Sequence, residues 1–217
     1  WRGWRMISRA ERTTFGEWWW TVDRLLLSAL FGLMLAGIVL SLAASPAVAH
    51  RIGLDTFHFV NRQVFFLIPA TAVLIGTSFL SPYWIRRLAF VAFLGALVLV
   101  VATLFIGAEI KGARRWLNFA GIGLQPSEFL KPAFVVLAAW LFAESAKRPE
   151  MPANLLAMLL LGATVTPLVL QPDVGQTSLI TAVWAALFFM AGMRWLWVFG
   201  LAGVGAAGIV GAYFTIP

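Results

Sequence analysis

Two oppositely charged side chains stand three residues apart at the start of a long apolar run. They are Glu128 and Lys131, and the run extends to about Ala143. Residues three apart share one face of a helix. A lone charge at the centre of a bilayer costs about 2.5–3.5 kcal/mol on insertion scales, so pairing lowers that cost, and we expect the pair to face a polar cavity. The pair is either functional or a clamp between helices, and its place within a membrane segment favours function.

Three neighbouring residues are expected to shape the start of the same helix. Pro126 is expected in the first turn, where its missing N–H is harmless. Ser127 is expected to cap the helix. Pro132 removes one hydrogen bond from the helix ladder, which leaves a carbonyl oxygen able to face the cavity.

A basic cluster precedes this helix and consists of Lys111, Arg114 and Arg115. An anionic group at the outer leaflet, such as a phosphate or pyrophosphate, would explain it, because the planar fork of arginine binds phosphate oxygens in a bidentate manner. Contact with lipid headgroups would explain it equally well, and composition does not separate these two interpretations.

A second polar segment runs from Gln171 to Thr177 and contains Asp173 between Pro172 and Gly175. Asp173 is either an acid that lines a cavity or a cap for the helix that follows. A carboxylate at a helix N-terminus is stabilising by about 0.3–1 kcal/mol. Taken alone, the residue is interpreted as a structural cap.

The elements that must position these residues are membrane-spanning helices. Hydrophobic residues make up 61% of the 217 residues and charged residues 12%, whereas a soluble domain is about half apolar and about a quarter charged. The apolar residues come in long blocks, which argues against a β-barrel, whose strands alternate over about 10 residues. The sequence therefore predicts an all-α fold, a polytopic bundle of transmembrane helices.

A helical span needs about 20 apolar residues, and the sequence contains seven candidates. They are separated by polar or helix-breaking segments such as Ser45-Pro46, Ser81-Pro82, Lys147 to Pro149, and Pro172-Asp173. The predicted spans are Leu25–Ala44, Val64–Leu80, Leu88–Gly107, Phe129–Ala143, Leu155–Leu170, Thr177–Ala191 and Leu196–Phe214.

Lysine and arginine counts predict a cytoplasmic N-terminus. With that orientation the inner segments hold about ten basic residues and the outer segments about five, as the positive-inside rule requires. Lys131 belongs to neither group because it falls within a span. The outer residues are Arg51, Arg62, Lys111, Arg114 and Arg115.

We expect one transmembrane domain over residues 1–217, with residues 1–23 as a cytoplasmic segment and residues 24–217 as the membrane portion. Nothing after Phe214 resembles a closing tail, so we expect the chain to be a fragment. It has no cysteine, and its two histidines, His50 and His58, lie in one predicted loop without further ligands nearby, so no metal site is predicted. Nucleotide-binding motifs are lacking, and the basic residues set membrane orientation rather than nucleic-acid binding.

Three motifs together resemble the SEDS family of shape, elongation, division and sporulation proteins. They are GARRWLN at 112–118, GLQPSEFLK at 123–131 and QPDVG at 171–175. They occur in the family's order, with spans between them, and the resemblance covers essentially the whole chain. Two N-terminal segments, 8–13 and 16–24, resemble the division member of the family more than the elongation member.

The resemblance implies a peptidoglycan glycosyltransferase of the bacterial cytoplasmic membrane at the division septum. SEDS proteins have ten spans and polymerise lipid II into glycan strands on the outer face. The implied partners are lipid II, a class B penicillin-binding protein (the septal transpeptidase), and other membrane proteins of the divisome. A carboxylate base would activate the acceptor hydroxyl, and cations would stabilise the departing polyprenyl pyrophosphate.

The resemblance also implies which residues act. The family's proposed catalytic aspartate lies in a large outer loop after the seventh span, so we expect it after residue 217 and assign no base here; Asp173 is not its equivalent. A divalent cation is compatible with the chemistry, but no ligand set is visible, so the cofactor stays unassigned. The residues expected to line the substrate cavity are Arg114, Arg115, Trp116, Gln125, Ser127, Glu128, Lys131, Gln171 and Asp173.

Two other functions stay open, a lipid II flippase or other transporter and a non-catalytic scaffold of the divisome. Transporters usually show paired broken helices in corresponding halves, and the breaks near Pro132 and Pro167 are poor repeats of each other. A transporter also needs a polar path to the inner face, whereas the polar motifs fall in the outer half. The sequence therefore favours the enzyme.

Overall fold

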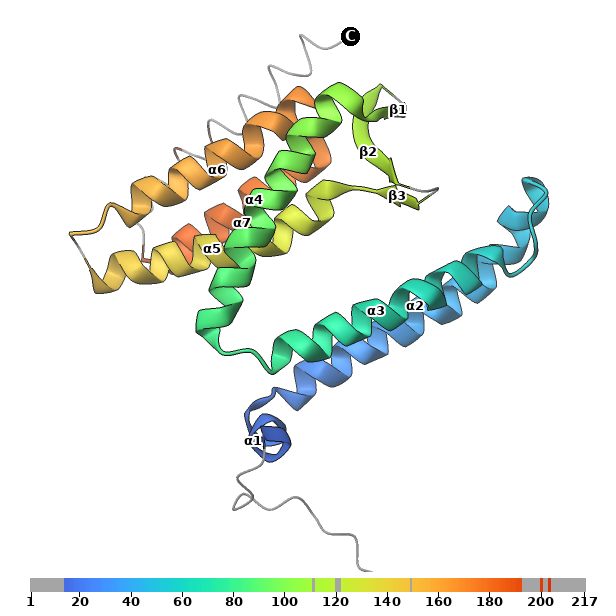
Figure 1. Ribbon diagram of the computed structural model, residues 1–217, viewed down its shortest axis with the longest axis horizontal. Helices are drawn as coiled ribbons and strands as arrows, with labels where there is room; N and C mark the ends of the chain where they lie inside the picture. Colours follow the sequence, from blue (N-terminus) through green and yellow to red (C-terminus); the bar gives the residue numbers. More distant parts are fainter. Residues whose placement is uncertain are drawn as a thin grey trace, which may run out of the picture. The chain divides into compact units, whose positions relative to one another are not determined.

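The computed structural model describes residues 14–110, 112–119, 122–148, 150–192, 200 and 203. These residues form two compact units, an N-terminal unit that ends at Ser81 and a C-terminal unit that begins at Pro82 (Figure 1). The prediction of a single transmembrane domain stays a prediction.

The N-terminal unit contains three helices, α1 (Thr14–Thr21), α2 (Arg24–Arg51) and α3 (His58–Ser78). Asp23 begins α2, because its Oδ1 accepts the N–H groups of Leu25 and Leu26, both at 3.0 Å. The short helix α1 is held by Trp18, whose indole N–H donates to Ser78 Oγ at 2.7 Å. The same indole stacks on Phe79, with ring centroids 4.8 Å apart.

The predicted break at Ser45-Pro46 is wrong, because α2 continues through Pro46 to Arg51. A proline removes one hydrogen bond from the ladder, and the rest of a long apolar helix can tolerate that loss. Consequently His50 lies in the last turn of α2 and His58 opens α3, so the histidines flank the connecting loop rather than sharing it.

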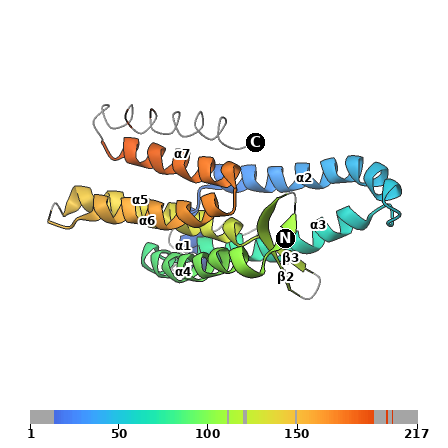
Figure 2. The ribbon, with the colours of Figure 1, turned by 90° about the horizontal axis from the view of Figure 1, so that it is seen from above.

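The C-terminal unit combines four helices with a small sheet. Figure 2 shows α5, α6 and α7 running alongside one another, and α4 packs against α5. Its elements are α4 (Pro82–Ile106), β1 (Ala108–Ile110), β2 (Ala113–Phe119), β3 (Ile122–Leu124), α5 (Pro126–Lys147), α6 (Ala153–Leu170) and α7 (Val174–Met190).

The helices α2 to α7 correspond to the first six predicted spans. By length and composition α2 to α6 can each cross a membrane, and α7 is a shorter apolar helix. Large apolar side chains such as Leu33, Ile68 and Val91 are exposed, as on surfaces that contact lipid. The predicted polytopic helix bundle is confirmed. The seventh predicted span, Leu196–Phe214, lies outside the described residues apart from Gly200 and Gly203.

The three-stranded sheet is an addition to the predicted fold. It is antiparallel, in the order β1-β2-β3, and the register places Glu109 opposite Arg114 and Asn118 opposite Gly123. Gly112, with φ of 76°, allows the reversal between β1 and β2. The strands β1 and β3 have only three residues each, and β2 (ARRWLNF) lacks a regular alternation of apolar and polar residues, so the sequence did not distinguish the sheet from a loop.

The core of the C-terminal unit is apolar and aromatic. Trp184 of α7 is buried, and its ring centroid lies 4.5 Å from that of Phe188 and 5.6 Å from that of Phe142 on α5. Its indole N–H donates to the carbonyl oxygen of Ala157 on α6 at 3.0 Å. A buried tryptophan needs such a partner, so this residue joins three helices.

Replacing Trp184 tests this packing. Trp184→Ala should lower the free energy of unfolding by about 3–5 kcal/mol through the cavity it creates. Trp184→Phe retains most of the ring contacts and should cost only about 0.5–1.5 kcal/mol for the lost hydrogen bond. The measurement is thermal unfolding of the detergent-solubilised protein, with the exposed Met190→Ala as control. Equal stability of Trp184→Ala and Met190→Ala would contradict the packing.

Candidate functional site

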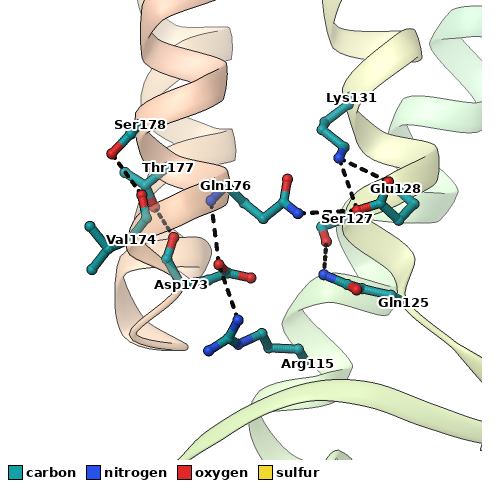
Figure 3. A network of polar contacts seen from close by, with 10 residues as sticks. All are labelled: Arg115, Gln125, Ser127, Glu128, Lys131, Asp173, Val174, Gln176, Thr177 and Ser178. Atoms are coloured by element: carbon teal, nitrogen blue, oxygen red, sulfur yellow. Dashed lines mark hydrogen bonds and ion pairs between the residues drawn. The ribbon is translucent and has the colours of Figure 1, made fainter. Parts of the chain in front are cut away.

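The predicted site residues of the C-terminal unit lie at one end of its helices. They come together because α4 and α6 end there, α5 and α7 begin there, and the sheet lies between α4 and α5 in the chain. Figure 3 shows the resulting polar network, which joins β2, the first turn of α5 and the first turn of α7.

The strand β2 separates the two arginines of the predicted basic cluster. The pairing of β2 with β1 is irregular here, because Arg114 lies opposite Glu109, Trp116 lies opposite Ala108, and Arg115 between them is an additional residue, as in a β-bulge that re-aims a side chain. Arg114 pairs with Glu109 at 3.4 Å and approaches the Leu104 carbonyl oxygen at 3.5 Å, whereas Arg115 pairs with Asp173 at 3.5 Å. The arginines therefore serve two different sites, and Lys111 lies outside the described residues.

Asp173 is a helix cap, as one of the two interpretations of the sequence predicted, whereas its role as an acid that lines a cavity stays a prediction. Its Oδ1 accepts the backbone N–H of Gln176 at 3.3 Å, which makes it the N-cap of α7. The same oxygen pairs with Arg115, and the Asp173 side chain is only 3% exposed. It is thus a cap and also a buried acid of the polar network.

The predicted pairing of Glu128 with Lys131 is present. Lys131 Nζ lies 2.8 Å from Glu128 Oε2 and 2.9 Å from Oε1. The lysine side chain is 22% exposed and the glutamate side chain 50% exposed. The ion pair therefore stands at the edge of the packed unit, where a ligand can reach it.

The start of α5 differs in one respect from the prediction. Pro126 occupies the first turn as predicted, but Ser127 is not the cap, because Gln125 is the N-cap residue and makes no side-chain capping bond. The proline begins the helix one residue ahead of the serine, which places Ser127 inside the first turn. There Ser127 is buried, and its Oγ accepts a hydrogen bond from Gln125 Nε2 at 3.1 Å.

Gln176 is a member of the network that sequence reasoning missed. Its Nε2 donates to Glu128 Oε1 at 3.1 Å, so it connects α7 to α5. The sequence offers only one clue, namely that Gln176 follows Asp173 by three residues, which is the spacing of a helix cap to its donor. The contact with Glu128 depends on how α7 packs beside α5 and could not be predicted.

The remaining predicted residues lie beside the network. Gln171 is buried, and its Nε2 donates to the Val100 carbonyl oxygen at 2.8 Å and to Thr103 Oγ1, so it ties the α6–α7 turn to α4. Trp116 is partly exposed at 36% and packs close to Gly123, where an added Cβ would lie 3.4 Å from the indole. These two residues support the sheet and the turn.

A pocket of about 270 Å³ opens on the Arg114 side of the sheet. We call it the Arg114 pocket. Its polar walls come from the exposed ion pair of Arg114 with Glu109 and from Gln171. The residues that line it are Leu104, Glu109, Gly112, Arg114, Leu170, Gln171 and Pro172.

The chemistry available at this end of the unit is electrostatic. Within the described residues no group of three or more His, Asp or Glu side chains could hold a metal ion. Three buried polar atoms of the network have no partner among the described residues: Arg115 Nε, Asp173 Oδ2 and Gln176 Oε1. Buried polar atoms are normally hydrogen-bonded, so this network has capacity for a further donor and acceptor.

The sequence matches a known family over most of its length. Residues 23–216 match the FtsW/RodA/SpoVE profile, described as "Cell cycle protein". A probable peptidoglycan glycosyltransferase FtsW of Caulobacter vibrioides is 50% identical over 209 residues, covering 96% of this chain and 54% of that protein. A protein of the same description from Escherichia coli is 30% identical over 212 residues, covering 96% of this chain and 50% of that protein. The chain thus spans about half the length of the curated relatives it matches.

Solved structures resemble the fold. The crystal structure of the rod shape determining protein RodA of Thermus thermophilus aligns with a TM-score of 0.65 at 26% identity, covering 86% of this chain and 60% of that one. A structure titled "Structural coordination of polymerization and crosslinking by a peptidoglycan synthase complex" aligns with a TM-score of 0.59 at 26% identity, covering 83% of this chain and 55% of that one.

The two neighbouring arginines give a matched test of the network. Arg115→Met leaves the buried Asp173 carboxylate without its cation and should lower the free energy of unfolding by about 1–3 kcal/mol. Arg114→Met breaks an exposed pair and should cost no more than about 1 kcal/mol. Thermal unfolding of the two purified variants in detergent measures the difference. Equal destabilisation, or a larger loss for Arg114→Met, would contradict the assignment.

Proposed function

This chain belongs to the FtsW/RodA/SpoVE family of cell cycle proteins, and we propose that it acts as a peptidoglycan glycosyltransferase of cell division. The substrate would be lipid II, polymerised into glycan strands on the outer face of the cytoplasmic membrane at the division septum. The names of its FtsW relatives support the reaction class. The observation that carries the proposal is the Glu128–Lys131 pair, an accessible ammonium group at the head of an apolar helix.

Lys131 is the cation best suited to the phosphates of the substrate. Its ammonium is a compact point charge, its side chain is partly exposed, and it pairs with Glu128. As the bond between the donor sugar and its polyprenyl pyrophosphate breaks, negative charge grows on the leaving group. A fixed positive charge beside that group lowers the barrier. We assign no general base within this chain.

The two arginines take different roles in this proposal. Arg114 lies half exposed in the Arg114 pocket, where it can contact an anionic headgroup. Arg115 is already paired with the buried carboxylate of Asp173, so it holds the sheet against the start of α7. The sequence suggested that both arginines bind the anion. We now propose that Arg114 binds it and that Arg115 has a structural role.

The proposed orientation places the N-terminus in the cytoplasm. The six described helices α2 to α7 would then bring the sheet, the head of α5 and the α6–α7 turn to the outer side. The distribution of lysine and arginine supports this orientation. Lipid-linked precursors could meet the network there without crossing the core of the unit.

The proposed protein partner is a class B penicillin-binding protein, the septal transpeptidase, together with other membrane proteins of the divisome. One structural relative comes from a peptidoglycan synthase complex in which, by its title, polymerisation and crosslinking are coordinated. A polymerase that delivers uncrosslinked strands needs such a partner. We assign no divalent cation to the site, since the described residues offer no ligand cluster for one.

A flippase or other transporter is the second candidate, and a scaffold that recruits the transpeptidase is the third. Transport of a polar headgroup requires a polar path between the two ends of the bundle. Below the network the described helices of the C-terminal unit pack through apolar side chains, among them Phe134, Leu137 and Trp184. This packing favours an enzyme that works at one face.

Replacing Lys131 tests the proposed chemistry. In the full-length protein with its transpeptidase partner, Lys131→Ala should abolish glycan polymerisation while membrane insertion is retained, because the cation that stabilises the leaving pyrophosphate is lost. The matched control is Lys147→Ala, an exposed lysine in the last turn of the same helix, which should polymerise normally. Strands are measured on a gel from labelled lipid II.

The same assay separates the candidate functions. Glycan strands from the purified wild-type complex, without any other polymerase, support the enzyme. Scrambling of labelled lipid II in vesicles without strands would support the flippase, and neither activity would support the scaffold. Wild-type strand output from Lys131→Ala would discard the role of Lys131.

Single cysteines test the proposed orientation. The 217 residues contain no cysteine, so this stretch adds no background labelling. Asp55→Cys, in the loop between α2 and α3, should react with a membrane-impermeant maleimide in intact cells. Ser81→Cys, between α3 and α4, should react only after the membrane is opened. The reverse pattern would place the network on the cytoplasmic side and contradict the proposal.

A further inference from the structure

Gln176 lies between the two ion pairs of the polar network and contacts both (Figure 3). We propose that Gln176 is a positioning residue, whose carboxamide fixes Glu128 so that the Lys131 ammonium is held toward the phosphates of the substrate. The inference rests on the proposed glycosyltransferase function and assigns a residue outside the three sequence motifs discussed above.

The geometry places Gln176 at the junction. Its backbone N–H donates to Asp173 Oδ1 at 3.3 Å, and its Nε2 donates to Glu128 Oε1 at 3.1 Å. Lys131 Nζ lies 2.9 Å from the same Glu128 oxygen. One carboxylate oxygen thus receives two donors, one from its own helix and one from α7.

The orientation of the amide follows from chemistry. An ionised carboxylate only accepts hydrogen bonds, so the NH₂ group of Gln176 must face Glu128. The amide oxygen is then directed elsewhere; it is buried and has no partner among the described residues. A residue that served only to fill space between α5 and α7 would not require this polar end.

The Glu128–Lys131 pair needs an external support. Both side chains belong to one helix, and the glutamate is half exposed. Exposed pairs of this kind hold two flexible side chains only weakly, since water competes and rotamer freedom opposes the contact. The hydrogen bond from Gln176 on a second helix is also charge-assisted, and it adds a second constraint on the rotamers of Glu128.

The support itself is anchored. The Gln176 backbone is fixed by Asp173, and Asp173 is paired with Arg115 on β2. The position of the Lys131 ammonium therefore depends on a chain of contacts that runs from the sheet through α7 to α5. The Lys131 ammonium is proposed to act in the transition state, when the leaving group departs. Loss of these contacts should therefore lower kcat more than it raises KM.

The experiment uses the full-length protein with its transpeptidase partner and measures steady-state polymerisation of lipid II. Gln176→Leu removes the amide at similar size, and Gln176→Asn keeps an amide that is one methylene too short to reach Glu128. Both should lower kcat about 10-fold or more, with KM within about two-fold of the wild type and an unchanged thermal midpoint. Ser178→Ala is the matched control, because Ser178 Oγ donates only to Val174 O within α7, and it should retain wild-type kcat.

The outcomes separate this inference from the function on which it rests. If the wild-type complex makes no strands, the proposed function fails. If the wild type is active and both Gln176 variants keep its kcat, the positioning role alone is overturned. A loss of activity that is accompanied by a matching fall in the thermal midpoint also overturns the positioning role. So does a variant whose only change is a higher KM. If Gln176→Leu does not fold, Gln176→Asn decides by the same criteria.

Discussion

A buried carboxylate constrains the end of the C-terminal unit where the polar residues meet. Asp173 is 3% exposed, and removing an ionised carboxylate from water costs several kcal/mol unless partners surround it. The partners come from two elements, Arg115 on β2 and the Gln176 N–H at the start of α7. The sheet and the α6–α7 turn must therefore keep their positions for the charge to stay buried. With the start of α7 fixed, the side chain of Gln176 reaches Glu128 on α5.

The end of the C-terminal unit that holds the polar network differs from the apolar interior of its helices, and this difference is relevant to the proposed function. Along their lengths α4, α5, α6 and α7 share a core of apolar residues, and the buried hydroxyls of Thr103 and Thr164 donate to carbonyl oxygens of their own helices. Ionisable groups with accessible charge, Lys131 and Arg114, occur where the helices begin or end. A charged headgroup can therefore be handled at one face while its lipid chain stays beside the apolar helix surfaces. This division suits a reaction on lipid-linked sugars.

Features set by one helix could be predicted from the sequence, and features set by contacts between elements could not. The helices followed from long apolar runs, and the Glu128–Lys131 pair followed from helical spacing alone. The Arg115–Asp173 pair joins residues 58 positions apart, so it depends on a sheet that the sequence did not reveal. The same limit applies to Gln176, whose contact with Glu128 requires α7 to pack beside α5. Local rules also failed at Pro46, which the sequence suggested as a break and α2 accommodates.

The irregular pairing of β2 has a consequence for how this segment can vary. Ala108 lies opposite Trp116 and its neighbour Glu109 lies opposite Arg114, so Arg115 is an additional residue of β2 that opposes no residue of β1. An additional residue of this kind re-aims a side chain, and here Arg114 contributes to the Arg114 pocket while Arg115 pairs with Asp173. Deleting the additional residue would make the pairing regular, but the buried acid would lose its present partner.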